Sequence, residues 1–149
     1  MTAPDHVLVP LDGSPLSFDA LRHTLSEFPG ASITVLHVID LFDPGYGVGD
    51  ADTTYEPMVG SDEWYAKVED RAEELLDEAS QLAADHGREV ETVSEIGEPG
   101  RVIVDYAAEQ PVDHVVVGTH GRPDAERSLF GSVADTVVRR APVPVTVVR

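Results

Sequence analysis

Short apolar stretches alternate with amphipathic ones along all 149 residues of the chain. The apolar stretches are rich in Val, Ile and Leu and predict buried strands at residues 6–11, 32–39, 90–96, 114–117 and 143–148. Between them, apolar residues recur at three- and four-residue spacing, which predicts helices at residues 16–28, 61–86 and 99–109 and from Ser132 onward. Strands that are apolar on both faces and alternate with helices predict an α/β fold, a doubly wound five-stranded parallel sheet in one domain with helices on both faces.

The loops after the first and fourth strands are the expected ligand site. In doubly wound sheets, ligands bind beyond the carboxyl ends of the strands, at the point where the chain order reverses direction. Asp12-Gly13-Ser14 follows the first strand, and Gly118-Thr119-His120-Gly121 follows the fourth. We therefore expect two polar loops that are distant in the sequence to face each other and form one site.

A glycine-rich segment joins the fourth strand to the last helix. After Gly121, nine residues precede Gly131-Ser132, where that helix begins. The first amide hydrogens of a helix have no partners within it and the helix dipole is positive there, so anions such as phosphate bind at this end, and glycine lets the backbone approach them closely. Ser132 could donate its hydroxyl to a phosphate oxygen or only cap its own helix, because Gly-Ser before a helix is often just a turn and a cap.

The chain is strongly acidic, with 28 acidic and 10 basic residues and a formal net charge of -18. Such a charge repels free DNA, RNA and anionic membrane surfaces. Lys67 is the single lysine, and an acidic, lysine-poor surface resembles that of halophilic proteins, although an acidic docking face for a basic partner is the alternative. No basic leader precedes an apolar stretch and no apolar run is long enough for a membrane span, so a cytoplasmic location is expected.

Residues 40–60 interrupt the alternation. They include prolines, four glycines and five acidic residues, without helical or strand period, and predict a long acidic surface loop. Segments of this length are usually lids or disordered insertions. Disorder or contact with a protein partner is favoured, although Tyr46, Tyr55 or Trp64 could close over a bound base. A solvated loop is also favoured over a cation site among the acidic residues Asp40, Asp43, Asp50 and Asp52.

Several motifs resemble the universal stress protein family, and the resemblance covers essentially the whole chain. They are Val9-Pro10-Leu11-Asp12-Gly13-Ser14, Leu36-His37-Val38-Ile39, Gly97-Glu98-Pro99, and the glycine-rich segment with Gly131-Ser132-Val133. The similarity is closest to the branch that carries the motif Gly-x-x-Gly-x9-Gly-Ser/Thr, which is met at Gly118, Gly121, Gly131 and Ser132. The resemblance implies the strand order 3-2-1-4-5 of an adenine nucleotide alpha hydrolase-like fold, and ATP, AMP or ADP as the ligand.

By the same resemblance, adenine would lie near Asp12 and Val38, and the ribose and phosphates along the glycine loop. The nucleotide-binding residues implied are Asp12, Val38, Gly118, Thr119, His120, Gly121, Arg122, Gly131, Ser132 and Val133. Within this set, His120 is expected to act through its backbone more than through its ring. His37 lies inside a strand, where a hydrogen-bonded interior histidine is favoured over a ligand, and no histidine pair has metal-binding spacing.

The loop within the motif departs from what a polyphosphate site needs. Asp124 and Glu126 place negative charge close to where the phosphates would lie. Arg122 and Arg127 could offset that charge, or they could only form surface ion pairs with the neighbouring acids. A divalent ion bridging the phosphates, Mg²⁺ or Mn²⁺, would help more, and no metal ligand is assigned to the protein itself.

Three functions remain open at this point. The favoured one is a nucleotide-binding regulatory module of the stress response, in which ATP shifts the conformation of a homodimer that an unknown protein partner recognises. No Walker lysine follows the glycines and no base is paired with a nucleophile, so no catalytic residue is assigned. The alternatives are an ATP-using enzyme, by slow hydrolysis or adenylyl transfer, and a nucleotide-free interaction protein.

The last strand is expected at an edge of the sheet. Bare edges invite pairing, and the same strand of a second subunit would complete it, as is common in the family that the chain resembles. The dimer edge would then comprise Val143, Val145 and Val147. Alternatively, Pro142 and Pro144 protect the edge, because proline has no amide hydrogen to donate.

Overall fold

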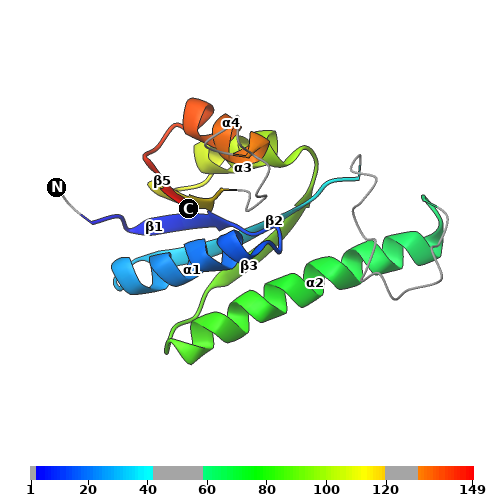
Figure 1. Cartoon of the computed structure of the whole chain (residues 1–149), viewed down its shortest axis with the longest axis horizontal. Coiled ribbons are helices and arrows are strands. Elements are labelled where there is room, and N and C mark those ends of the chain that lie inside the picture. Colours follow the sequence, from blue (N-terminus) through cyan, green and yellow to red (C-terminus); the bar gives the residue numbers. More distant parts are fainter. Residues whose placement is uncertain (1–2, 42–58, 120–130) are drawn as a thin grey trace.

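The computed structural model describes residues 3–41, 59–119 and 131–149. The strands form one five-stranded parallel sheet of order β3-β2-β1-β4-β5. They are β1 (His6–Pro10), β2 (Ser32–Ile39), β3 (Glu91–Ile96), β4 (His114–Gly118) and β5 (Val145–Val148), and the helices are α1 (Pro15–Glu27), α2 (Asp62–Asp85), α3 (Pro99–Glu109) and α4 (Ser132–Arg140). The expected doubly wound α/β fold and its strand order are confirmed (Figure 1).

Helices cover both faces of the sheet, with α1 and α2 on one face and α3 and α4 on the other (Figure 1). The core on the first face consists mainly of Val7, Val9, Leu21, Leu25, Val35, Leu75 and Ala79. The core on the second face consists mainly of Leu8, Leu36, Ile103, Ala107, Val115, Ala134 and Val137. Successive residues of β1 therefore serve opposite cores, which is why this strand is a continuous apolar run in the sequence.

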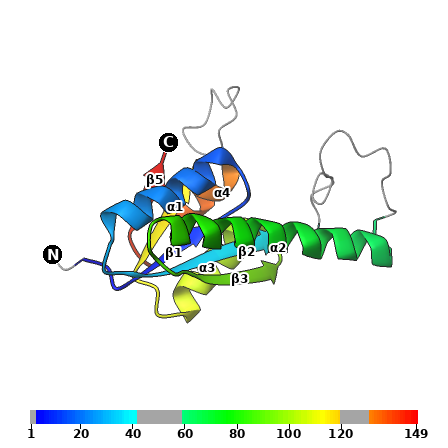
Figure 2. The same ribbon diagram turned by 90° about the horizontal axis from the view of Figure 1, so that it is seen from below.

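The amino-terminal part of α2 extends past the carboxyl ends of the strands (Figure 2). The Ser61 hydroxyl accepts a hydrogen bond from the Trp64 amide at 3.1 Å, which fixes the start of the helix. Trp64, Val68 and Ala72 then recur at four-residue spacing and pack with Ile39, the last residue of β2. This packing holds α2 beside the loops that leave the sheet at this end.

The outer strand β3 differs from the sequence prediction. Apolar strands covered on both faces were expected, but in β3 only Val93 is half-buried and the other side chains are exposed. β3 is an edge strand, and apart from Val93 and Ile96 its residues are polar: Glu91, Thr92, Ser94 and Glu95. The prediction that strands are buried on both faces is therefore right for the central strands and wrong for β3.

The opposite edge strand is shorter than predicted. β5 begins at Val145, so Val143 lies before the strand instead of within it. The reason is that Pro142 and Pro144 have no amide hydrogen for a ladder, although the Pro144 carbonyl still accepts a hydrogen bond from the Val115 amide at 3.0 Å. Only Val145 and Val147 of the predicted dimer edge lie on β5.

The predicted acidic loop at residues 40–60 falls mostly outside the described residues. Its two ends are described: Asp40 and Leu41 follow β2, and Val59 and Gly60 precede α2. Within the described ranges, no helix is both long and apolar enough to cross a membrane.

Candidate functional site

The chain order reverses between β1 and β4, which are neighbours in the sheet and pair at Val7 with His114 and at Leu8 with Val115. From β1 the chain continues into α1 on one face, whereas the helix after β4 is α4 on the other face (Figure 1). In doubly wound sheets, ligands bind beyond the carboxyl ends of the two strands at such a reversal, and we call this position between β1 and β4 the crevice. The residues at those ends are the Asp12 turn and Gly118, as the sequence predicts.

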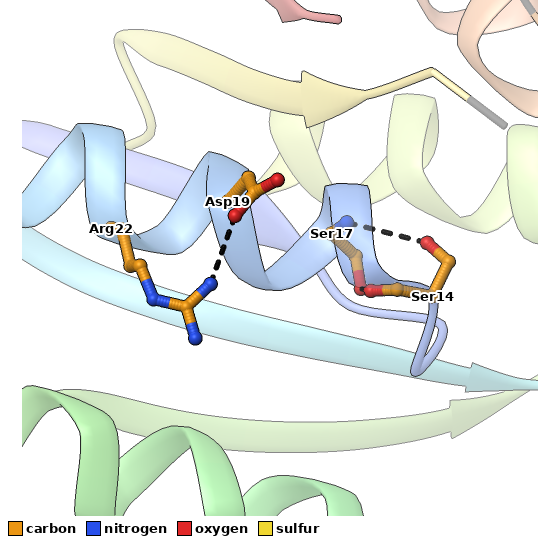
Figure 3. A network of polar contacts seen from close by, with 4 residues as sticks. All are labelled: Ser14, Ser17, Asp19 and Arg22. Carbon is orange, nitrogen blue, oxygen red and sulfur yellow. Dashed lines mark hydrogen bonds and ion pairs between the residues drawn. The ribbon is translucent and has the colours of Figure 1, made fainter. Parts of the chain in front are cut away.

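The turn after β1 is held by its own side chains. Gly13 has a φ of 91°, in the region that favours glycine. The Asp12 carboxylate accepts a hydrogen bond from the Ser14 amide at 2.8 Å. Ser14 in turn caps α1, because its hydroxyl accepts from the Ser17 amide at 3.3 Å and its carbonyl accepts from the Ser17 hydroxyl at 2.8 Å (Figure 3). Asp12 thus stands at a fixed and exposed position beside the crevice.

Val38 lies close to this turn through the register of the sheet. β1 and β2 pair in parallel up to Pro10 with Leu36, so the same register continued by two residues sets Asp12 next to Val38. The Val38 side chain is buried against α3 and α4. A ligand would therefore meet the backbone of Val38 instead of its side chain.

His37 is an interior histidine, as predicted from its place in a strand. It is 2% exposed, and its Nδ1 forms a hydrogen bond with the Leu11 carbonyl at 2.7 Å. Burial lowers the pKa of His37, while the hydrogen bond to Leu11 and the negative charge of Asp12 oppose that change. The neutral ring ties the centre of β2 to the residue that precedes the Asp12 turn.

Arg71 is a residue near the site that the sequence analysis did not identify. A Cβ placed on Gly13 would lie 3.4 Å from Nη2 of Arg71 and 2.9 Å from a methyl group of Leu75. The guanidinium therefore rests against the turn, and its charge also lowers the pKa of His37. The only signal in the sequence is that Arg71 precedes Ala72 in a helix whose buried face includes Ala72 and Leu75.

Gly118 is required by the packing of the protein itself. A Cβ at this position would lie 2.5 Å from the carbonyl oxygen of Leu16 and 3.0 Å from the amide nitrogen of Ser17, so the first turn of α1 rests directly on the end of β4. The next residue, Thr119, is buried, and its amide donates to the Val148 carbonyl at 2.9 Å. These two motif residues belong to the wall of the crevice.

The amino terminus of α4 is the part of the site that is suited to an anion. Its N-cap residue, Gly131, has a φ of -64°, and no side chain among the described residues caps the helix. Ser132 is exposed, whereas Val133 is half-buried. Ala134 is buried in the apolar core on this face of the sheet, which also contains Val38 and Val117, and Val133 packs against that core.

Charge near this helix end is already partly balanced. Asp135 in the first turn of α4 forms an ion pair with Arg139 at 3.1 Å. His120, Gly121 and Arg122 of the predicted site lie outside the described residues, as do the charged residues Asp124, Glu126 and Arg127. In the described part of the chain, no three His, Cys, Asp or Glu side chains are grouped so that they could hold a metal ion.

Comparison with known proteins places these features in one family. The model of the Universal stress protein family matches residues 4–149. The chain is 31% identical over 147 residues to Universal stress protein MJ0531 of Methanocaldococcus jannaschii, covering 96% of this chain and 81% of that protein.

Two solved structures of universal stress proteins have the same fold. UspA from Lactobacillus plantarum superposes with a TM-score of 0.77 at 24% identity, covering 100% of both chains. A universal stress protein solved in complex with cAMP superposes with a TM-score of 0.70 at 25% identity, covering 99% of each chain.

Proposed function

Because this chain belongs to the universal stress protein family, we propose that it binds an adenine nucleotide in the crevice between β1 and β4. The observation that carries the proposal is the amino terminus of α4. Its first amides are uncapped by any described side chain, and Ala134 in its first turn is buried in the apolar core that α3 and α4 form on this face of the sheet. The relative that was solved with cAMP supports an adenine nucleotide as the ligand class.

The described residues suggest which part of the nucleotide each side of the crevice would hold. The amides of Ser132 and Val133 and the Ser132 hydroxyl would donate to phosphate oxygens, because a helix amino terminus offers unpaired donors and a positive dipole end. Asp12 and the backbone of Val38 would hold the base, and the ribose would lie along the glycine loop. Gly118 and Thr119 form the wall between the two parts, and residues His120, Gly121 and Arg122 would complete the phosphate loop.

ATP, ADP or AMP fits this donor set. The groups proposed to face the phosphates are backbone amides and one hydroxyl, which bind oxyanions, whereas the described residues offer no cluster of metal ligands. Mg²⁺ or Mn²⁺ would therefore be held through the phosphates and would neutralise their charge, which matters in a chain with a net charge of -18.

We further propose that the protein acts as a homodimeric switch in the cytoplasm. The exposed edge of β5, with Val145 and Val147, would pair with the same strand of a second subunit, and an unknown protein partner would recognise the nucleotide-bound form. The acidic surface fits work at high salt, where its self-repulsion is screened.

Calorimetric titration with ATP, AMP and cAMP in molar KCl with MgCl₂ tests the nucleotide site. Gly131→Val should abolish binding, because a branched side chain at the cap blocks the approach of a phosphate, while its φ of -64° is open to any residue and the fold should survive. Gly30→Val is the matched control, since a Cβ there meets nothing within 4 Å. Equal binding by both variants, or no binding by the parent protein, would contradict the proposal.

A further inference from the structure

A hollow lies between α2 and β3. Its volume is about 260 Å³. The helix side carries Glu69, Glu73 and Asp77, the strand side carries Thr92 and Ser94, and apolar side chains form the rest of its lining, namely Ile39, Ala72 and Leu76. Among the described residues, none that lines it is basic. We call this hollow the α2–β3 groove.

The strand that borders the groove has an open edge. β3 pairs in parallel with β2 on one side and is the outermost strand of the sheet. Its outer backbone amides and carbonyls therefore have no strand partner in the described part of the chain. Such an edge is a template for an added strand unless side chains prevent it.

The charge of the side chains along this edge determines which kind of segment could be added as a further strand. Glu91 and Glu95 are exposed on β3, and Ile96 at its carboxyl end is 63% exposed. A second copy of this chain, with its net charge of -18, would be repelled by these carboxylates. A basic segment would instead be attracted to them, and an apolar residue at its end would cover Ile96.

The spacing of the charges on α2 matches an extended peptide. Glu69, Glu73 and Asp77 recur every four residues, which corresponds to a rise of about 6 Å along the helix. Every second residue of a strand points to the same face and advances by about 6.6–6.8 Å. Basic side chains at alternate positions of a strand added to β3 would therefore be spaced much like the carboxylates of the groove.

We propose that the edge of β3 and the α2–β3 groove bind an extended basic segment of a protein partner by strand addition. The main-chain hydrogen bonds of β3 supply a sequence-independent part of the binding. The three carboxylates of α2 supply the preference for Lys or Arg at alternate positions. None of the residues that line the groove is among those proposed to bind the nucleotide.

The probe is a short synthetic peptide in which Lys and Thr alternate, titrated into the full-length protein and followed by fluorescence anisotropy at fixed ionic strength. A triple variant, Glu69→Gln, Glu73→Gln and Asp77→Asn, removes the groove charges. The matched control, Asp70→Asn, Glu74→Gln and Glu78→Gln, removes the same charge at the same spacing from exposed positions of α2 outside the groove. A peptide N-methylated at alternate residues keeps its charges but loses backbone donors.

The groove variant should bind the peptide roughly 3- to 100-fold more weakly, as three exposed charge pairs would predict, and the control variant should bind like the parent protein. The N-methylated peptide should bind much more weakly, and the Lys-Thr peptide should slow amide hydrogen exchange in β3. Equal weakening by both variants would mean diffuse attraction to an acidic surface and would overturn the proposal. Undiminished binding of the N-methylated peptide would overturn strand addition, as would the absence of any binding.

Discussion

Replacing Gly118 with alanine should destabilise the protein even when no nucleotide is present. The added Cβ would lie 2.5 Å from the carbonyl oxygen and 2.6 Å from the carbonyl carbon of Leu16, and 3.0 Å from the Ser17 amide nitrogen. All three are backbone atoms in the first turn of α1, so no side-chain rotation can relieve the overlap. The turn must move away from β4, along with the hydrogen bonds by which Ser14 caps the helix.

The size of the effect follows from this overlap. Overpacking by a methyl group in a rigid environment costs about 1–3 kcal/mol. Since each 1 kcal/mol lowers the midpoint of thermal unfolding by about 2–4 °C in a domain of this size, Gly118→Ala should lower it by roughly 2–12 °C.

Thermal unfolding of the nucleotide-free protein, followed by circular dichroism, provides the measurement. Gly30→Ala is the control, because its Cβ would meet nothing within 4 Å, and its midpoint should stay the same or rise slightly. If Gly118→Ala unfolded at the parent temperature and lost only nucleotide binding, this glycine would serve the approach of the ligand and the packing argument would be refuted.

Three further perturbations test other parts of the structure. Burial holds the pKa of His37 below its ordinary value of 6.5. The neutral ring therefore contributes stability above pH 6.5, and this stability is lost as the pH falls through the pKa of the folded state. In urea unfolding, His37→Asn should lose less stability on acidification than the parent protein. If two subunits pair through β5 as proposed, Val145→Lys should give monomers by light scattering, because it places a charge at the first residue of that strand; a mass equal to that of the parent protein would count against this interface. Molar KCl should raise the unfolding midpoint, because 28 acidic residues repel each other and salt screens that repulsion; a midpoint independent of salt would contradict this reasoning.

The order of elements could be predicted from the sequence because the central strands are buried on both faces. β1, β2 and β4 are therefore visible as continuous apolar runs, and β2 was placed with its exact ends at Ser32 and Ile39. The edge strands were less predictable. The exposure of β3 depends on which strand is outermost in the sheet. The late start of β5 depends on Pro144, whose carbonyl accepts a hydrogen bond from the Val115 amide but whose nitrogen has no hydrogen to donate.

The site was predictable in outline and not in the roles of its residues. Topology alone locates the Asp12 turn and the end of β4 at the same edge. Gly118 was interpreted from its motif as a point of close ligand approach, and only the coordinates reveal the contact that α1 makes there. Arg71 was missed for a similar reason, because the distance from α2 to Gly13 depends on how the helix packs on the sheet and not on any local pattern.

A crystal structure of the protein with ATP and Mg²⁺ would be the most direct test of the nucleotide site. We predict phosphate oxygens within about 2.7–3.2 Å of the amide nitrogens of Ser132 or Val133, with adenine beside Asp12 and Val38. A nucleotide bound elsewhere, or phosphates held only by side chains and not by the amino terminus of α4, would contradict that prediction.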